Sequence, residues 1–379
     1  MSFIKYMVKV ITKYPGIFFL ALYLAAAPPA GAVSGTGTAN PGAGRVSGLS
    51  GVGTRAAEFL TIPVGPRAVA MGGAYSAAAD EITAIYWNPA GLGFLEQREV
   101  FLAVVERPLD IRYTYGAIAL PVWENRLVLG GFLSILTSGE QEVTTETQPE
   151  GTGEYYTAYS MSAGGAVAYN FSDRFCAGLV VKNVHEDIYG LTQDAVAFDM
   201  GTNYHEEVFG YPLRLAFTIT NLGTNMQFGG DRLRVRLPPE DIYPGHDIGR
   251  LDRLAARQTG IFKLPTSFHI SGSIGLVNTD YYSLLTGVEF CENSNQPVSV
   301  SAGAELTRKL NRKSLVAFRA GWRAQQDELE LSGSENLRGL SLGAGFTYQL
   351  YKLTIRADYA YRNLGILSAN HTYALSLQF

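Results

Sequence analysis

The residues best placed to do chemistry are charged side chains inside segments that otherwise alternate apolar with small polar residues. Eight of them fall on the polar positions of such segments: Asp199, Arg214, Glu289, Glu305, Arg319, Arg323, Arg356 and Asp358. Acids and arginines that share an enclosed space pair with one another, and an arginine without a partner is suited to a carboxylate or phosphate. We therefore expect these charges either to hold neighbouring elements together or to bind the anionic headgroup of a ligand.

The sequence offers little for catalysis or metal binding. Five histidines are spread along the chain: His185, His205, His246, His269 and His371. They form neither an i, i+4 pair with a glutamate nor a Cys/His cluster with zinc spacing. The two cysteines, Cys176 and Cys291, are expected near opposite ends of their strands, too far apart for a disulfide. We predict a protein that is not an enzyme and has no cofactor or metal.

The elements that must position these charges are β-strands. The last segment, Thr372–Phe379, places Tyr373, Leu375 and Leu377 on one face and small polar residues on the other. Turn residues separate about fourteen such segments between Glu99 and Phe379. Closed barrels in outer membranes have an even number of antiparallel strands, apolar outside and polar inside, because an open edge is not tolerated in lipid. We predict an all-β fold, a single transmembrane antiparallel β-barrel of about 14 strands, with Phe379 as the C-terminal aromatic residue of membrane insertion.

Composition and loop lengths agree with this fold. Charged residues make up 17% of the chain, against about 25% in typical soluble domains, and the 22 tyrosines and 19 phenylalanines suit aromatic girdles at the membrane interfaces. A net charge of −4 argues against a nucleic-acid partner. The long connections follow odd-numbered strands, which predicts that they face outward: Thr137–Gly153, Leu222–Leu264, Ala324–Leu337 and Arg362–Ser368.

The N-terminus predicts export. Lys5, Lys9 and Lys13 precede the apolar run Ile17 to Ala27, and Ala30-Gly31-Ala32 forms a small-residue cleavage site. The predicted organisation is a signal peptide over 1–32, a flexible Gly/Ser/Thr-rich linker over 33–53, a plug segment over 54–97 and the barrel over 98–379. After cleavage the protein would lie in the outer membrane of a diderm bacterium, in contact with outer-membrane lipid and with the barrel-assembly machinery.

The segment before the barrel has a different periodicity. Asp80 is expected to cap a short helix, and Asn88-Pro89 to begin another. Small residues such as Gly72 and Gly73 allow close packing against surrounding walls. Arg67 is expected to pair with an acid of the lumen or to anchor a ligand. We predict a compact helical plug inside the barrel.

Residues 65–92 resemble the N-terminal signature of the PorV/PorQ family, within the superfamily of FadL-type long-chain fatty-acid transporters. The matching pattern is G-x-R-A-x-A-M-G-G-A, an acidic pair, and W-N-P-A-G-L, and it includes Arg67, Met71, Gly72, Gly73, Asp80, Trp87, Asn88, Pro89, Ala90 and Gly91. The family mostly has two aspartates where this sequence has Asp80-Glu81. The resemblance implies that Asn88-Pro89-Ala90 belongs to a hatch inside a fourteen-stranded barrel, and we expect the matched residues to line a ligand route.

The resemblance leaves two functions open. FadL-type relatives imply a passive uptake channel for hydrophobic or amphipathic small molecules, in which a shift of the hatch or a gap between strands releases the ligand. PorV-like relatives imply an accessory or shuttle protein of type IX secretion, with secretion-system proteins as partners. The hatch signature belongs to both groups.

Overall fold

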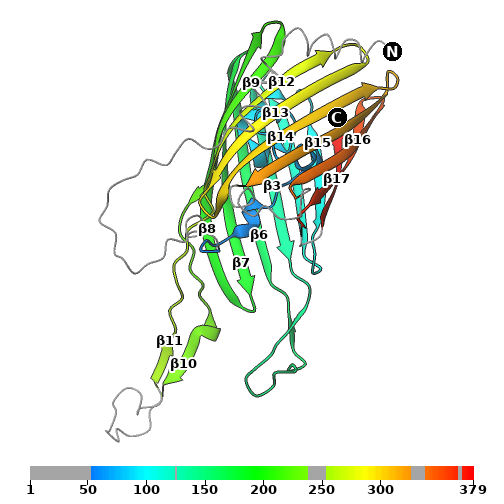
Figure 1. Ribbon diagram of the computed structural model, residues 1–379. Helices are drawn as coiled ribbons and strands as arrows, with labels where there is room; N and C mark the ends of the chain where they lie inside the picture. The colour runs from blue at the N-terminus through cyan, green and yellow to red at the C-terminus, as the bar shows by residue number, and fades with distance from the viewer. Residues whose placement is uncertain (1–52, 124–125, 238–252, 326–337, 366–368) are drawn as a thin grey trace, which may run out of the picture.

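The computed structural model describes residues 53–123, 126–237, 253–325, 338–365 and 369–379 (Figure 1). The predicted signal peptide lies outside the described residues, as does the predicted linker except for Gly53. Parts of three predicted outer loops, Leu222–Leu264, Ala324–Leu337 and Arg362–Ser368, also lie outside them.

Fourteen antiparallel strands form a closed barrel, as predicted. In chain order they are β1 (Glu99–Glu106), β2 (Arg112–Val122), β3 (Leu127–Thr137), β6 (Tyr159–Ser172), β7 (Phe175–Ile188), β8 (Leu191–Val208), β9 (Tyr211–Gly223), β12 (Ser267–Asn278), β13 (Tyr282–Asn293), β14 (Gln296–Lys309), β15 (Ser314–Gln325), β16 (Leu340–Leu350), β17 (Leu353–Asn363) and β18 (Ala369–Gln378). The last strand pairs with the first, with Glu99 opposite Gln378 and Glu106 opposite His371. Every strand of the barrel is hydrogen-bonded to both neighbours.

The two ends of the barrel differ. At the short-turn end, connections of two to four residues join even-numbered strands of the barrel to the next strand. At the long-loop end the chain adds a hairpin of β4 (Gln141–Glu142) and β5 (Tyr155–Tyr156), the 3-10 turn η3 (Asp231–Leu233), and a second hairpin of β10 (Arg234–Leu237) and β11 (Arg253–Ala256). The β10–β11 hairpin projects well beyond the barrel rim (Figure 1). The sequence predicted the long connections but not these short strands.

The outer face of the barrel is apolar and its inner face is polar. Exposed side chains on the outside include Leu102, Leu133, Phe217, Phe318, Phe346 and Leu375. Buried side chains on the inside include Ser162, Asn203, Thr218, Ser341, Thr372 and Ser376. A soluble sheet has the opposite arrangement, whereas a barrel in lipid needs this one.

An aromatic belt marks the short-turn end. Exposed aromatic side chains lie in or beside five of its turns: Trp123, Phe171, Phe209, Tyr281 and Tyr351. Phe209 and the following Gly210 both have positive φ, 53° and 79°, the conformation that a tight two-residue hairpin needs. The belt is the girdle that the abundance of tyrosine and phenylalanine predicted.

The chain before the barrel lies inside it. Short helical elements η1 (Glu58–Thr61), α3 (Pro66–Ala70), α4 (Ala84–Trp87) and η2 (Pro89–Phe94) make up the plug. Helix α3 packs on β15 to β18, whereas η2 packs on β3 and on β6 to β8, the opposite side of the barrel. The plug therefore spans the lumen. Among the described residues, no helix has the length and hydropathy to cross a membrane.

Rows of inward glycines bring the wall into backbone contact with the plug. Four neighbouring strands contribute one each: Gly287, Gly303, Gly321 and Gly343. A Cβ on Gly303 would lie 2.3 Å from the carbonyl oxygen of Met71, and a Cβ on Gly321 would lie 2.1 Å from its carbonyl carbon. Across the lumen, a Cβ on Gly178 would lie 2.3 Å from the carbonyl carbon of Pro89. Any larger residue at these positions would displace the plug.

We expect the long-loop end to face outward. An epitope inserted at Gly139 should bind antibody on intact cells, whereas the same epitope within the β12–β13 turn, residues 279–281, should bind only after the outer membrane is opened. Reversed accessibility would contradict the orientation, and equal accessibility would contradict a membrane barrel.

We also expect Gly303→Ala to unseat the plug, because its Cβ would overlap Met71 in a backbone contact that cannot rotate away. Conductance in planar bilayers should rise several-fold. Gly131→Ala is the matched control, since that Cβ would meet no atom nearer than 3.8 Å. Equal conductance of the two variants would show that the glycine row does not seat the plug.

Candidate functional site

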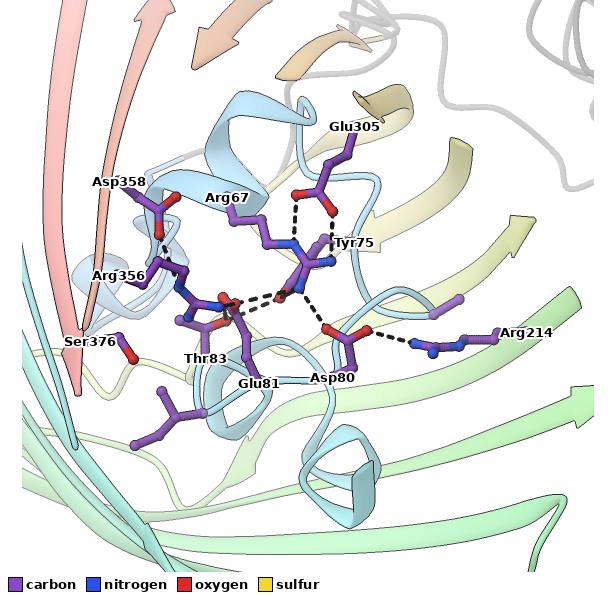
Figure 2. A network of polar contacts seen from close by, with 12 residues as sticks. Arg67, Tyr75, Asp80, Glu81, Thr83, Arg214, Glu305, Arg356, Asp358 and Ser376 are labelled. Atoms are coloured by element: carbon purple, nitrogen blue, oxygen red, sulfur yellow. Dashed lines mark hydrogen bonds and ion pairs between the residues drawn. The ribbon is translucent and has the colours of Figure 1, made fainter. Parts of the chain in front are cut away.

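Arg67 is the centre of a polar network between plug and wall (Figure 2). It lies on α3, and its Nε and Nη2 donate to the two carboxylate oxygens of Glu305 on β14, both at 2.8 Å. Its Nη1 donates to Oδ1 of Asp80 at 2.6 Å and lies 3.4 Å from Oε2 of Glu81. The bidentate contact with Glu305 fixes both the position and the orientation of α3, because the guanidinium plane must match the carboxylate. The sequence expectation that Arg67 pairs with a lumen acid is met by Glu305.

The network extends through three further arginines, all on strands. Arg319 joins Glu305, at 2.6 Å, to Asp358, at 2.5 Å. Arg356 contacts three carboxylates, Glu81 at 2.5 Å, Asp358 at 3.1 Å and Glu99 at 3.2 Å. Arg214 on β9 reaches the second oxygen of Asp80 at 3.0 Å. Four guanidinium groups and five carboxylates thus tie the plug to β1, β9, β14, β15 and β17.

The neighbouring acids Asp80 and Glu81 are held ionised. Burial alone would raise the pKa of the Asp80 carboxyl, but Arg67 and Arg214 hold that pKa well below its ordinary value. Burial opposes ionisation of Glu81 in the same way, and Arg356 and Arg67 lower its pKa. Both side chains therefore keep their charge, and their ion pairs with the wall, at neutral pH.

The structure corrects the role expected for Asp80. The residue does not cap a helix, since α4 begins after Thr83 without a side-chain cap, and the Asp80 carboxylate serves the two arginines instead. Asn88 does begin η2, where its Oδ1 accepts from the amide of Ala90 at 3.2 Å. Its Nδ2 donates to the carbonyls of Ser76 and Thr202.

The remaining matched residues of the plug are buried against the wall. Met71, Gly72 and Gly73 follow α3, with Met71 against the glycine row. Residues 88–91 pack against β7 and β8, where a Cβ on Gly201 would lie 2.1 Å from Oδ1 of Asn88. Trp87 donates from Nε1 to the carbonyl of Val64 at 2.8 Å. Of the ten residues that match the family signature, Trp87 lines a cavity between plug and wall, which we call the aromatic cavity.

The aromatic cavity lies between plug and wall on the long-loop side of Arg67. The space that the centre of a water molecule can occupy has a volume of about 60 Å³. That is enough for several waters or a small organic group. One side is aromatic: Tyr86, Trp87, Tyr113, Tyr115 and Phe132. The other side carries polar and charged residues: Lys182, Asp199, His269, Cys291 and Arg323. An enclosed space with one apolar and one charged side suits an amphipathic ligand.

Arg323 differs from the other inward charges. Among the described residues it has no ion pair, and its buried Nε has no hydrogen-bond partner. The other seven predicted inward charges are all paired, Asp199 with Lys182 at 2.6 Å and Glu289 with His269 at 2.8 Å. Ion pairing among the described residues therefore accounts for seven of the eight charges and leaves the Arg323 guanidinium without a carboxylate partner there.

A polar cluster shapes the wall of the cavity at β9. Asn221 has a positive φ of 59°, and its amide donates to Oδ1 of Asp199 at 2.6 Å. Lys182 donates to both Asp199 and the side chain of Asn221, each at 2.6 Å. The pairing of β8 with β9 shifts register at this point. The cluster stabilises this irregular pairing of β8 and β9 next to the cavity.

A second hollow opens at the short-turn end. Its volume is about 640 Å³, and it is lined by Asp80, Phe94, Lys309, Arg312 and Thr354 among others. The Arg67 network therefore lies between an enclosed cavity on the long-loop side and an open hollow on the other.

Sequence reasoning missed Lys182, Tyr113, Tyr115 and Phe132. They lie on strands distant in sequence, and only the barrel brings them to one cavity. Period-two alternation identifies them as inward residues but does not say which of them meet. At the C-terminus, the amide of Phe379 donates to the carbonyl of Arg98 at 3.0 Å, and its ring is exposed at the short-turn end.

Comparisons with known proteins identify the fold. No protein-family model and no curated protein matches this chain. The Pseudomonas putida toluene transporter TodX has a similar structure, with a TM-score of 0.50 and 10% identity over 83% of this chain and 96% of that one. A deltaS2 mutant of the TodX monoaromatic hydrocarbon channel gives 0.52 and 11%, over 83% and 98%. A Pseudomonas aeruginosa FadL homologue gives 0.48 and 12%, over 84% and 98%. The chain has the FadL-like fourteen-stranded barrel fold.

Removing the Arg67 guanidinium should loosen the plug, because the carboxylates of Asp80 and Glu305 lose a buried partner. Arg67→Met should lower the free energy of unfolding in urea by roughly 3–5 kcal/mol and raise ion conductance. Arg174→Met is the control, since it breaks an exposed pair with Glu206 and should change little. An Arg67→Met protein as stable and as tightly closed as wild type would contradict the role of the network.

Proposed function

We propose that this protein is an outer-membrane channel for the passive uptake of hydrophobic or amphipathic compounds. The observation that carries the proposal is the aromatic cavity, which has an apolar side and a charged side and lies on the long-loop side of the plug. The apolar outer face, the aromatic belt and the predicted signal peptide support an outer-membrane location. The TodX structures, which belong to a toluene transporter and a monoaromatic hydrocarbon channel, support a channel for apolar compounds.

Arg323 gives the cavity a binding site for an anionic headgroup. Its guanidinium lacks a carboxylate partner among the described residues, and the aromatic side of the cavity offers a surface for an apolar body. A carboxylate bound there would supply the missing acceptor for the buried Nε. The favoured ligand is therefore an amphiphile with one acidic group.

Passage requires the plug to shift. Each strand of the wall pairs with both neighbours, and the Arg67 network separates the cavity from the hollow at the short-turn end. A ligand captured in the cavity would move on when α3 and the Asp80 turn are displaced. No energy source is needed beyond the concentration gradient. The matched residues Asn88 to Gly91 would line the route in the displaced state.

The test compares an acid with its neutral ester. Arg323→Met should reduce uptake of a medium-chain fatty acid about tenfold, the loss of one charge-assisted hydrogen bond, and leave uptake of the methyl ester unchanged. Arg112→Met, which removes the same charge from the exposed outer end of β2, should alter neither. Equal loss of acid and ester would contradict a headgroup site, and equal uptake by wild-type and null cells would contradict the channel.

The second candidate is an accessory protein of type IX secretion, related to the PorV/PorQ family. The β10–β11 hairpin supports it, because a projection this far beyond the rim is not needed to close a channel and offers a surface to a partner protein (Figure 1). Co-purification of a secreted protein or a translocon subunit with the wild type, and its loss when residues 231–257 are deleted, would favour this function over uptake.

A further inference from the structure

Three reactive side chains stand in series in the wall of the aromatic cavity. Oε1 of Glu289 lies 2.8 Å from Nδ1 of His269, and Nε2 of the same imidazole lies 3.9 Å from Sγ of Cys291. His269 on β12 is the direct cross-strand neighbour of Cys291 on β13, and Glu289 lies two residues before the cysteine on the same inward face. The order carboxylate, imidazole, thiol is therefore built into the register of one strand pair.

The carboxylate of Glu289 is held in place by the plug. It is buried, and its second oxygen accepts from the amides of Tyr75 at 3.0 Å and Ser76 at 2.8 Å. With Oε1 accepting from Nδ1–H of His269, the lone pair of Nε2 is directed to the thiol. This arrangement activates cysteine nucleophiles, in which the imidazole accepts the thiol proton and the carboxylate stabilises the imidazolium.

The second cysteine provides an internal comparison. Cys176 is buried, and the groups that its Sγ meets are those of the backbone: the carbonyl of Ala177 at 3.8 Å and backbone groups of Gly93 and Tyr169. Cys291 is partly exposed and lines the cavity. Both are free thiols, so a difference in their reactivity reports their surroundings. The other titratable groups of the cavity are Lys182, Asp199, Arg323, Tyr86, Tyr113 and Tyr115.

We propose that Cys291 is a nucleophilic thiol that covalently captures α,β-unsaturated carbonyl compounds reaching the cavity. Nε2 of His269 takes the thiol proton, and the sulfur forms a bond to the β-carbon of the compound. The π electrons of the carbon–carbon double bond move to the carbonyl as an enolate. The α-carbon then receives the proton back from the imidazolium, which leaves a thioether without a leaving group or a redox change. Glu289 is a positioning residue that orients and stabilises the imidazole.

The test measures alkylation of the full-length protein in detergent by iodoacetamide, with both cysteines quantified by peptide mass spectrometry. In this probe reaction the sulfur–carbon bond forms as iodide leaves. At pH 6.5, Cys291 should react at least about tenfold faster in wild type than in His269→Asn, because an ordinary thiol with a pKa near 8.5 is almost entirely protonated there. The wild-type rate should be nearly flat from pH 6 to 8, and the variant rate should rise steeply. Cyclohexenone should add once, at Cys291.

His269→Asn keeps a hydrogen-bond donor for Glu289, and heat-modifiability on gels checks that the barrel is intact. Glu289→Gln, which keeps an acceptor for the two plug amides, should give an intermediate rate at pH 6.5. Identical pH profiles in wild type and His269→Asn would overturn the proposal. So would a Cys291 that reacts no faster than Cys176, or one that reacts only after unfolding in SDS.

Discussion

The bidentate ion pair between Arg67 and Glu305 is the interaction on which the rest of the lumen depends. The Arg67 side chain is deeply buried, and a buried charge without partners is strongly destabilising. Glu305, Asp80 and Glu81 meet that need from the wall and the plug together. Once Arg67 is fixed, Asp80 and Glu81 are directed to Arg214 and Arg356, and these contacts together set the orientation of the plug. The main role of these charged side chains in the lumen is therefore to hold the plug in place.

Close backbone packing holds the plug in addition to the ion pairs. Glycines on four adjacent strands let the backbone around Met71 approach the wall, and glycines on the opposite side admit the start of η2. The plug is thus in close contact with two opposite walls, while the aromatic cavity remains between them on the long-loop side. The residues that seat the plug and those that line the cavity are largely different sets, so substitutions can change one without the other.

Much of the barrel fold could be predicted from the sequence. Period-two alternation and the C-terminal strand predicted a closed barrel of fourteen strands, and the turn lengths predicted which end carries the loops. The inward positions of Arg214, Glu305, Arg319, Arg356 and Asp358 followed from the same alternation. Which charges pair did not follow, since Arg67 and Glu305 are 238 residues apart and only barrel closure brings them together. Asp80 was misread as a cap because local rules favour caps and its arginine partners are not local.

The cavity was beyond sequence reasoning for the same reason. Its aromatic side comes from α4, β2 and β3, and its charged side from β7, β8, β12, β13 and β15. In the sequence, Arg323 looks like the other inward arginines. Only the structure shows that those arginines have carboxylate partners and that Arg323 has none among the described residues. The Glu289–His269–Cys291 series likewise depends on the pairing of β12 with β13, which sequence spacing alone does not reveal.

Residues 56–91 lie inside the barrel, and we expect them to fill and close its lumen. The most direct measurement is the single-channel conductance, in planar bilayers, of a barrel from which these residues have been deleted, compared with wild type. We expect a folded, heat-modifiable barrel that conducts as a large open pore, whereas the wild type conducts little. An intact barrel with unchanged conductance would contradict this expectation.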